Sequence, residues 1–104
     1  MIKASYLVEN GIIQSIEISG HAEYDHSGKD IVCAAVSTAI IVTANAIELL
    51  DLNSNRELWI DEGYFKIEVL NNNEIVNKLL LNLEYTLYDL EKQYPKYIKN
   101  QKEG

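Results

Sequence analysis

The sequence is poor in several residue types, and each scarcity excludes a class of protein. A single cysteine among 104 residues rules out an internal disulfide, and with it a disulfide-stapled secreted scaffold. Nine Lys and Arg residues stand against sixteen Asp and Glu, for a formal net charge of −7. Because a nucleic-acid backbone is bound by clustered Lys and Arg, we expect no nucleic-acid partner. An acidic surface suits a basic partner, or it simply keeps the protein in solution.

No long apolar core of a signal peptide is present in the N-terminal stretch MIKASYLVENG, so we expect a cytoplasmic location. The most apolar stretch, 31–50, raises the question of a membrane span. It lacks flanking basic anchors, and a buried helix with no membrane partner is the better prediction. This stretch also contains polar residues, namely Ser37, Thr38, Thr43, Asn45 and Glu48.

Alternation of apolar and polar residues predicts two hairpins. The first joins strands at Met1–Glu9 and Ile12–Ser19 through Asn10-Gly11, because a type I′ turn needs positive φ at both central residues. The second joins Leu58–Ile60 and Tyr64–Leu70 around the turn sequence Asp61-Glu62-Gly63.

Two helices complete the predicted pattern. Asp30 is placed to cap a helix from Ile31 to about Leu50, which is apolar nearly all round and should be buried on more than one side. A central position, or packing against a second subunit, would satisfy that helix. The second helix, Glu74–Tyr94, has its leucines at helical spacing and stops at Pro95.

The resulting order is ββαββα in a single domain, residues 1–104. Hairpins with helices between them predict the α+β class, with two helices packed on a largely antiparallel four-stranded sheet. The C-terminal tail, the one basic stretch of the chain, is expected to be a solvated end. Its basic character comes from Lys92, Lys96, Lys99 and Lys102.

The stretch GHAEYDHSGKDIVCAAVS, residues 20–37, holds both histidines and the cysteine. Cys33 falls in the first turn of the first predicted helix, where backbone N–H groups and the helix dipole stabilise a thiolate. Ser37 lies one turn further on the same face. His21 follows the second strand, from which it can reach over the helix start. A thiolate beside an imidazole is the arrangement for nucleophilic attack on a carbonyl.

Plainer interpretations of the same residues stay open at this point. A lone cysteine in an apolar helix is commonly a small buried hydrophobe, and His21 can be an ordinary strand-end residue. Gly20 and Gly28 can serve tight turns alone. The spacing of His21, His26 and Cys33 matches no structural zinc pattern, so no metal or other cofactor is expected. A redox function lacks a resolving cysteine.

The pattern Gly20-His21-Ala22, a loop with Gly28, and then Asp30-Ile31-Val32-Cys33-Ala34-Ala35-Val36-Ser37 resembles the signature of the ribosomal-processing cysteine proteases (Prp). The likeness covers the whole chain in length and in the order of hairpins and helices. By position, the resemblance implies that Cys33 is the nucleophile and His21 the general acid/base. It implies supporting roles for Asp30 and Ser37, with Gly20 and Gly28 framing the stretch, whereas His26 falls in the loop where such proteins vary.

The resemblance also implies a substrate and an assembly. Members of the family remove a short N-terminal extension from large-subunit ribosomal protein twenty-seven, and they are homodimers. The predicted function is therefore a cysteine endopeptidase, with a basic ribosomal protein as substrate. The oxyanion would be stabilised by backbone N–H groups at the helix start, that of Cys33 and a neighbour. A third residue that orients His21 is not identified, and Asp30 and Asn45 are both candidates.

Two further interpretations follow from the same stretch. A non-catalytic homodimeric module that binds ribosomal protein or ribosome precursor is the alternative function, with Cys33 in the core and His21 structural. The segment 22–29 is either an ordinary loop or a lid, with Tyr24 packing over the site and Gly20 and Gly28 absorbing the backbone change.

Overall fold

The structure is a computed structural model of the whole chain, and it describes residues 1–21 and 30–104. In chain order, its elements are β1 (Ile2–Glu9), β2 (Ile12–Ser19), α1 (Ile31–Leu49), the 3-10 turn η1 (Asn53–Asn55), β3 (Arg56–Asp61), β4 (Tyr64–Val69), α2 (Glu74–Gln93) and β5 (Ile98–Glu103). Five of the six long predicted elements agree with these bounds to within about a residue; β3 is longer than predicted at both ends.

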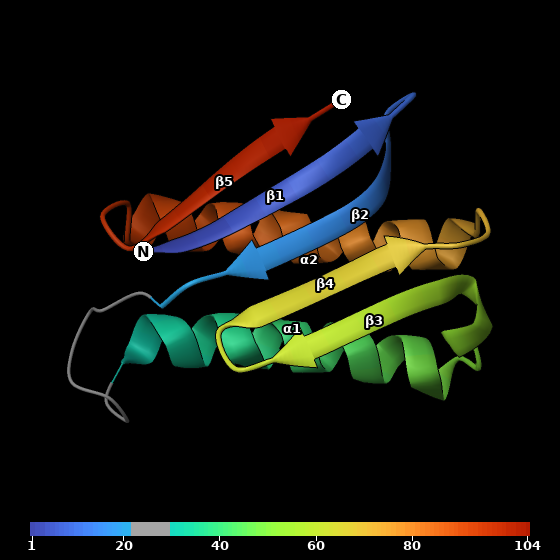
Figure 1. Cartoon of the computed structure of the whole chain (residues 1–104), viewed down its shortest axis with the longest axis horizontal. Helices are drawn as coiled ribbons and strands as arrows, with labels where there is room; N and C mark the ends of the chain where they lie inside the picture. Colours follow the sequence, from blue (N-terminus) through green and yellow to red (C-terminus); the bar gives the residue numbers. More distant parts are fainter. Residues whose placement is uncertain (22–29) are drawn as a thin grey trace.

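The described strands form one sheet in the order β3-β4-β2-β1-β5, with both helices on one face (Figure 1). Every neighbouring pair is antiparallel except β1 with β5, which run parallel. The α+β class, with two helices on a largely antiparallel sheet, is confirmed. The expectation of four strands is wrong, because β5 adds a fifth.

The strand β5 corrects the expectation of a solvated C-terminal end. Ile98 is fully buried and pairs with Ile2 at the start of β1. Further along β5, the Asn100 amide donates to the Leu87 carbonyl at 3.0 Å and to the Glu91 carboxylate at 2.9 Å, both on α2. Ile98 and Asn100 are therefore anchored within the fold, whereas the lysines of this segment stay exposed.

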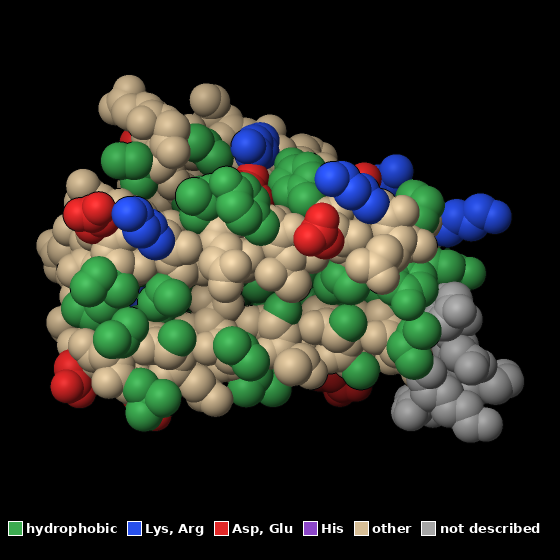
Figure 2. Space-filling view, turned by 180° about the vertical axis from the view of Figure 1, so that it is seen from behind, with side chains coloured by type: hydrophobic (Ala, Val, Ile, Leu, Met, Phe, Trp, Pro, Cys, Tyr) green, Lys and Arg blue, Asp and Glu red, His purple; other side chains and the backbone are tan. Residues whose placement is uncertain are grey.

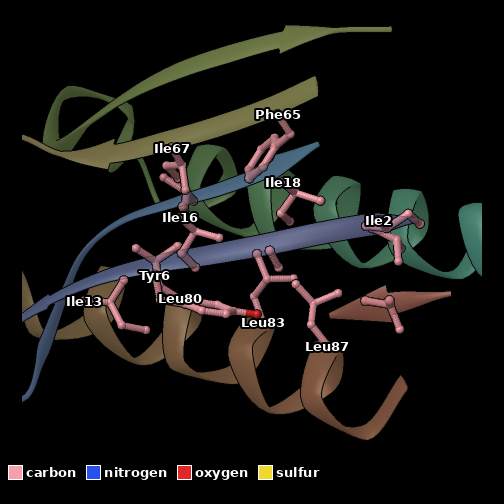
Figure 3. Close-up of a cluster of buried hydrophobic side chains, with 14 of the residues drawn as sticks. Ile2, Tyr6, Ile13, Ile16, Ile18, Phe65, Ile67, Leu80, Leu83 and Leu87 are labelled. Carbon is pink, nitrogen blue, oxygen red and sulfur yellow. The ribbon is translucent and has the colours of Figure 1, made fainter. Parts of the chain in front are cut away.

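The hydrophobic core lies between the sheet and the two helices, and Figure 3 shows the part of it that packs on α2. Apolar side chains from alternate positions of the strands meet the leucines that α2 presents at helical spacing. The fully buried members with the largest side chains are Tyr6, Ile16, Ile47, Ile67, Leu80, Leu83, Leu87, Ile98, Val32 and Val76. This core fixes the ends of β2 and of the β3–β4 hairpin relative to the helices.

Helix α1 is buried on one side only within the single chain. Its buried residues are Val32, Val36, Thr43 and Ile47, so the expectation of a central helix is wrong. Large apolar side chains of α1 stay exposed, among them Val42 at 61% and Leu49 at 81%, and groups of hydrophobic side chains lie on the helix side of the molecule (Figure 2). By length and composition alone, α1 is also apolar enough to cross a membrane, with a mean hydropathy of 1.8. Core helices of folded domains pass that same test.

Candidate active site

A cavity of about 380 Å³ opens beside the first half of α1. Three segments far apart in the sequence surround it: the end of β2, the start of α1 and the turn that joins β3 to β4. Figure 1 shows this turn over the first half of α1. The cavity is lined mainly by apolar side chains, and its lining residues include Ile2, Ile18, His21, Cys33, Val36, Ser37, Ile40, Ile60, Asp61, Glu62 and Phe65.

Cys33 occupies the third position of α1 and is half-buried at the cavity. The helix begins there because Asp30 caps it, as predicted: its backbone is extended, with φ −75° and ψ 102°. One carboxylate oxygen, Oδ1, accepts from the N–H of Val32 at 2.9 Å and from that of Cys33 at 3.0 Å. A capping carboxylate satisfies donors that the helix itself leaves without acceptors. Asp30 thus fixes the backbone that carries the thiol.

The Asp30 cap uses the backbone N–H groups that were expected to stabilise the oxyanion. The N–H of Cys33 donates to the Asp30 side chain, and the N–H of Ala34 donates to the Asp30 carbonyl at 3.1 Å. The donors at the helix start are therefore directed at Asp30 in this structure. The expectation that the Cys33 N–H stands ready for an oxyanion does not match this geometry.

His21 is exposed and follows the end of β2, on the same cavity as Cys33. The residue before it, Gly20, has a φ of +96°, and a Cβ there would meet the Met1 carbonyl oxygen at 2.3 Å. Only glycine fits such a backbone and such a close approach. The N–H of Gly20 also donates to the Gly63 carbonyl at 2.9 Å. Gly20 therefore brings His21 to the cavity.

The structure thus brings together His21, Cys33 and Ser37, which all line one cavity, with Asp30 capping the helix behind Cys33. Neither of the two candidates for orienting His21, Asp30 and Asn45, is among the described residues that line the cavity. Gly28, His26, Tyr24 and the proposed lid at 22–29 lie outside the described residues.

The side of the cavity formed by residues 60–65 was not predicted from the sequence. The turn Asp61-Glu62-Gly63 was recognised as a turn, but no local signal associates it with His21. The carboxylate residues of this turn, Asp61 and Glu62, stand beside a mainly apolar lining. Among residues 1–21 and 30–104, no group of three His, Cys, Asp or Glu side chains is arranged to hold a metal ion.

A half-buried thiol on a capped helix start, with an imidazole on the same cavity, is the side-chain set of a cysteine peptidase. The family described as Cysteine protease Prp matches residues 1–99, so the chain belongs to this family and is a cysteine protease.

Individual relatives agree with this assignment. The chain is 30% identical over 95 residues to the ribosomal processing cysteine protease Prp of Staphylococcus aureus, covering 88% of each chain. A solved structure of the S. aureus protease with a covalently linked product peptide matches at a TM-score of 0.91 and 28% identity, over 99% of this chain and 100% of that one. A Streptococcus mutans structure matches at a TM-score of 0.84 and 34% identity, over 98% and 93% of the two chains.

Proposed function

We propose that this cysteine protease removes the N-terminal extension of large-subunit ribosomal protein twenty-seven, with Cys33 as nucleophile and His21 as general acid/base. The observation that carries the proposal is the convergence of Cys33 and His21 on one cavity from separate elements. The names of the relatives support ribosomal processing as the biological setting, and a relative that forms a covalent link with its product peptide supports an acyl-enzyme route.

The reaction begins with attack of the Cys33 thiolate on the scissile carbonyl, which forms a tetrahedral intermediate with an anionic oxygen. Collapse of that intermediate breaks the C–N bond, and protonated His21 gives its proton to the departing amine. The acyl group then sits on Cys33 as a thioester. His21 next takes a proton from water, whose oxygen attacks the thioester; cleavage of the C–S bond then releases the new carboxyl end and restores the Cys33 thiolate beside protonated His21.

The cavity favours a particular kind of peptide. Its apolar lining accepts an apolar side chain of the substrate, since burying such a group is worth roughly 1.5–3 kcal/mol. Asp61 and Glu62 stand on the same cavity, and the chain as a whole carries a net charge of −7. Both features suit a basic substrate, because complementary charge speeds association. A ribosomal protein has that character.

We also propose that the working protein is a homodimer in the cytoplasm, acting without nucleic acid or membrane. The unburied apolar side of α1 supports a protein partner, because contiguous exposed apolar surface marks an interaction site. Ile41 at 56% and Ile60 at 66% exposure extend this surface to the cavity. A second copy seated there would border the substrate site.

The experiment is incubation of the protein with ribosomal protein twenty-seven that carries its extension, with the products identified by mass spectrometry. We expect one cut that releases the extension. Cys33→Ala should abolish cleavage, and His21→Ala should lower the rate by ~10²–10⁴-fold, the usual contribution of a general acid/base. Both variants should keep the wild-type circular dichroism spectrum, because alanine fits where a cysteine or an exposed histidine stood.

His26→Ala is the matched control, and it should cleave at close to the wild-type rate. Continued processing by Cys33→Ala would remove the nucleophile assignment and leave a binding module as the better description. Equal losses from His21→Ala and His26→Ala would contradict the assignment of His21 as the single acid/base.

A further inference from the structure

The turn between β3 and β4 makes an unusual contact with the cavity. Gly63 has a φ of +68°, and a Cβ built on it would stand 2.9 Å from Nε2 of His21 and 3.3 Å from its Cε1. Those are distances at which a methyl group and a ring atom overlap. The His21 imidazole therefore rests directly on the backbone of Gly63, in space that any other residue would fill.

A backbone hydrogen bond ties the same two segments together. The Gly63 carbonyl accepts from the N–H of Gly20 at 2.9 Å, so the chain on the N-terminal side of His21 is held by the residue on which its ring rests. His21 is exposed and follows the end of β2, so burial in the core does not fix its side-chain torsions. The hydrogen bond and the ring contact together locate both the main chain and the ring.

We propose that Gly63 is a positioning residue for catalysis, which holds the His21 imidazole in its working orientation at the cavity. The proposal rests on the role of His21 as general acid/base given above. The ring atom nearest to a Cβ built on Gly63 is Nε2, one of the two ring nitrogens through which a histidine gives or takes a proton. A ring displaced from that position still titrates, but it no longer delivers its proton to the leaving amine.

The competing explanation is that Gly63 serves the turn alone, because a positive φ by itself favours glycine. The chain offers a matched control for that explanation. Gly11, in the turn between β1 and β2, has a φ of +76°, and a Cβ there would meet nothing within 4 Å. Gly11→Ala therefore imposes a similar backbone strain with no contact to any other group.

Gly63→Ala adds to this strain a methyl group against the end of a flexible, exposed side chain. The fold relieves the overlap by moving the ring, which is cheap for stability and costly for catalysis, since a shift of about 1 Å in an active site can cost 10²-fold in rate. We expect similar melting temperatures for Gly63→Ala and Gly11→Ala. We expect kcat/KM to fall about 10- to 100-fold further in Gly63→Ala, mainly through kcat.

A double-mutant cycle with His21→Ala isolates the contact. In the His21→Ala background, where no ring is present to displace, Gly63→Ala should cost no more activity than Gly11→Ala does. The ring can also be observed directly, by the NMR resonance of its Cε1–H, which is identified by its loss in His21→Ala. That resonance should move in Gly63→Ala and stay in place in Gly11→Ala, with no substrate present.

The outcomes separate this proposal from the proposed function. If His21→Ala cleaves normally, His21 is not the acid/base and the function assignment fails. If His21→Ala is crippled while Gly63→Ala matches Gly11→Ala in kcat and in the His21 resonance, the dyad stands and the positioning role of Gly63 is overturned. Equal costs of Gly63→Ala with and without His21 would also overturn it.

Discussion

The carboxylate of Asp30 connects the local structure of α1 to its chemistry. One oxygen of this side chain accepts from two backbone N–H groups, one of which belongs to Cys33. The sequence predicted this cap, and the resemblance to the protease family gave Asp30 a supporting role. The structure supplies a physical meaning for that role: the carboxylate holds the first turn of the helix and therefore the direction of the thiol.

Two substitutions of Asp30 should separate the effect of its capping hydrogen bonds from the effect of its negative charge. Asp30→Ala should lower the free energy of unfolding by about 0.5–2 kcal/mol, the usual cost of losing an N-cap, and should slow cleavage because the Cys33 backbone frays. Asp30→Asn keeps the capping oxygen, so its stability and cleavage should stay close to those of the wild type. Urea unfolding and peptide cleavage measure the two effects. A loss of cleavage in Asp30→Asn as large as that in Asp30→Ala would show that the negative charge itself is needed.

Among the elements, β5 depends most on partners distant in the sequence. It pairs with β1 along its whole length, and its side chains reach α2. Asn100 accepts from the hydroxyl of Tyr6 and donates to Glu91, while Lys102 pairs with the buried Glu84 at 3.2 Å. These bonds offset the cost of placing polar groups at the edge of the core.

The burial of Tyr6 at this junction predicts a dependence of stability on pH. Burial, and next the nearby Glu84 carboxylate, raise the pKa of the Tyr6 hydroxyl well above its ordinary value. Above pH ~10, the usual pKa of a tyrosine, the unfolded chain releases a proton that the folded chain keeps. Stability from this group is complete below that pH, and it then falls by about 1.4 kcal/mol per pH unit.

Tyr6→Phe should remove this contribution to the slope. We expect wild-type stability, measured by urea unfolding, to fall more steeply between pH 10 and 11 than that of Tyr6→Phe, by about 1.4 kcal/mol per unit. Tyr85→Phe changes an exposed tyrosine of α2 and is the matched control, which should keep the wild-type slope. Parallel slopes for wild type and Tyr6→Phe would contradict the burial of an un-ionised Tyr6.

At the scale of the whole molecule, α1 leaves one apolar side exposed to solvent. The two helices lie on the same face of the sheet (Figure 1), and neither covers the outer side of α1. Val42 and Leu49 point away from the buried residues of that helix and are 61% and 81% exposed. A second copy of the chain would remove this area from water, which is the basis of the proposed homodimer.

We expect sedimentation equilibrium at micromolar concentration to give twice the 11.8 kDa mass of one chain. Val42→Glu should weaken the dimer by at least about tenfold, because it places an unpaired charge in an apolar interface. Tyr85→Glu puts the same charge on an exposed site of α2 and should leave the association unchanged. A wild-type protein that sediments as a stable monomer would refute the homodimer.

The sequence alone determined most of the local structure of this protein. The turn at Asn10-Gly11, with φ of +52° and +76°, the cap at Asp30 and the leucine face of α2 all follow from residues that act on neighbours within a few positions. The motif that identified Cys33 and His21 is equally compact. Signals of this kind are readable because the groups that interact are close together along the chain.

The remaining features depend on contacts between distant segments. The segment of β5 has too few apolar residues to show a strand period, and it becomes a strand because β1 offers it an open edge and α2 satisfies Asn100. Gly63 has no local relation to His21, yet the pairing of β2 with β4 brings the two residues into contact. Short-range preferences thus determine where each helix and turn begins. The cavity, the fifth strand and the contact of the His21 ring with Gly63 form only when the sheet assembles. The interactions that stabilise them join residues far apart in the sequence, which no local pattern encodes.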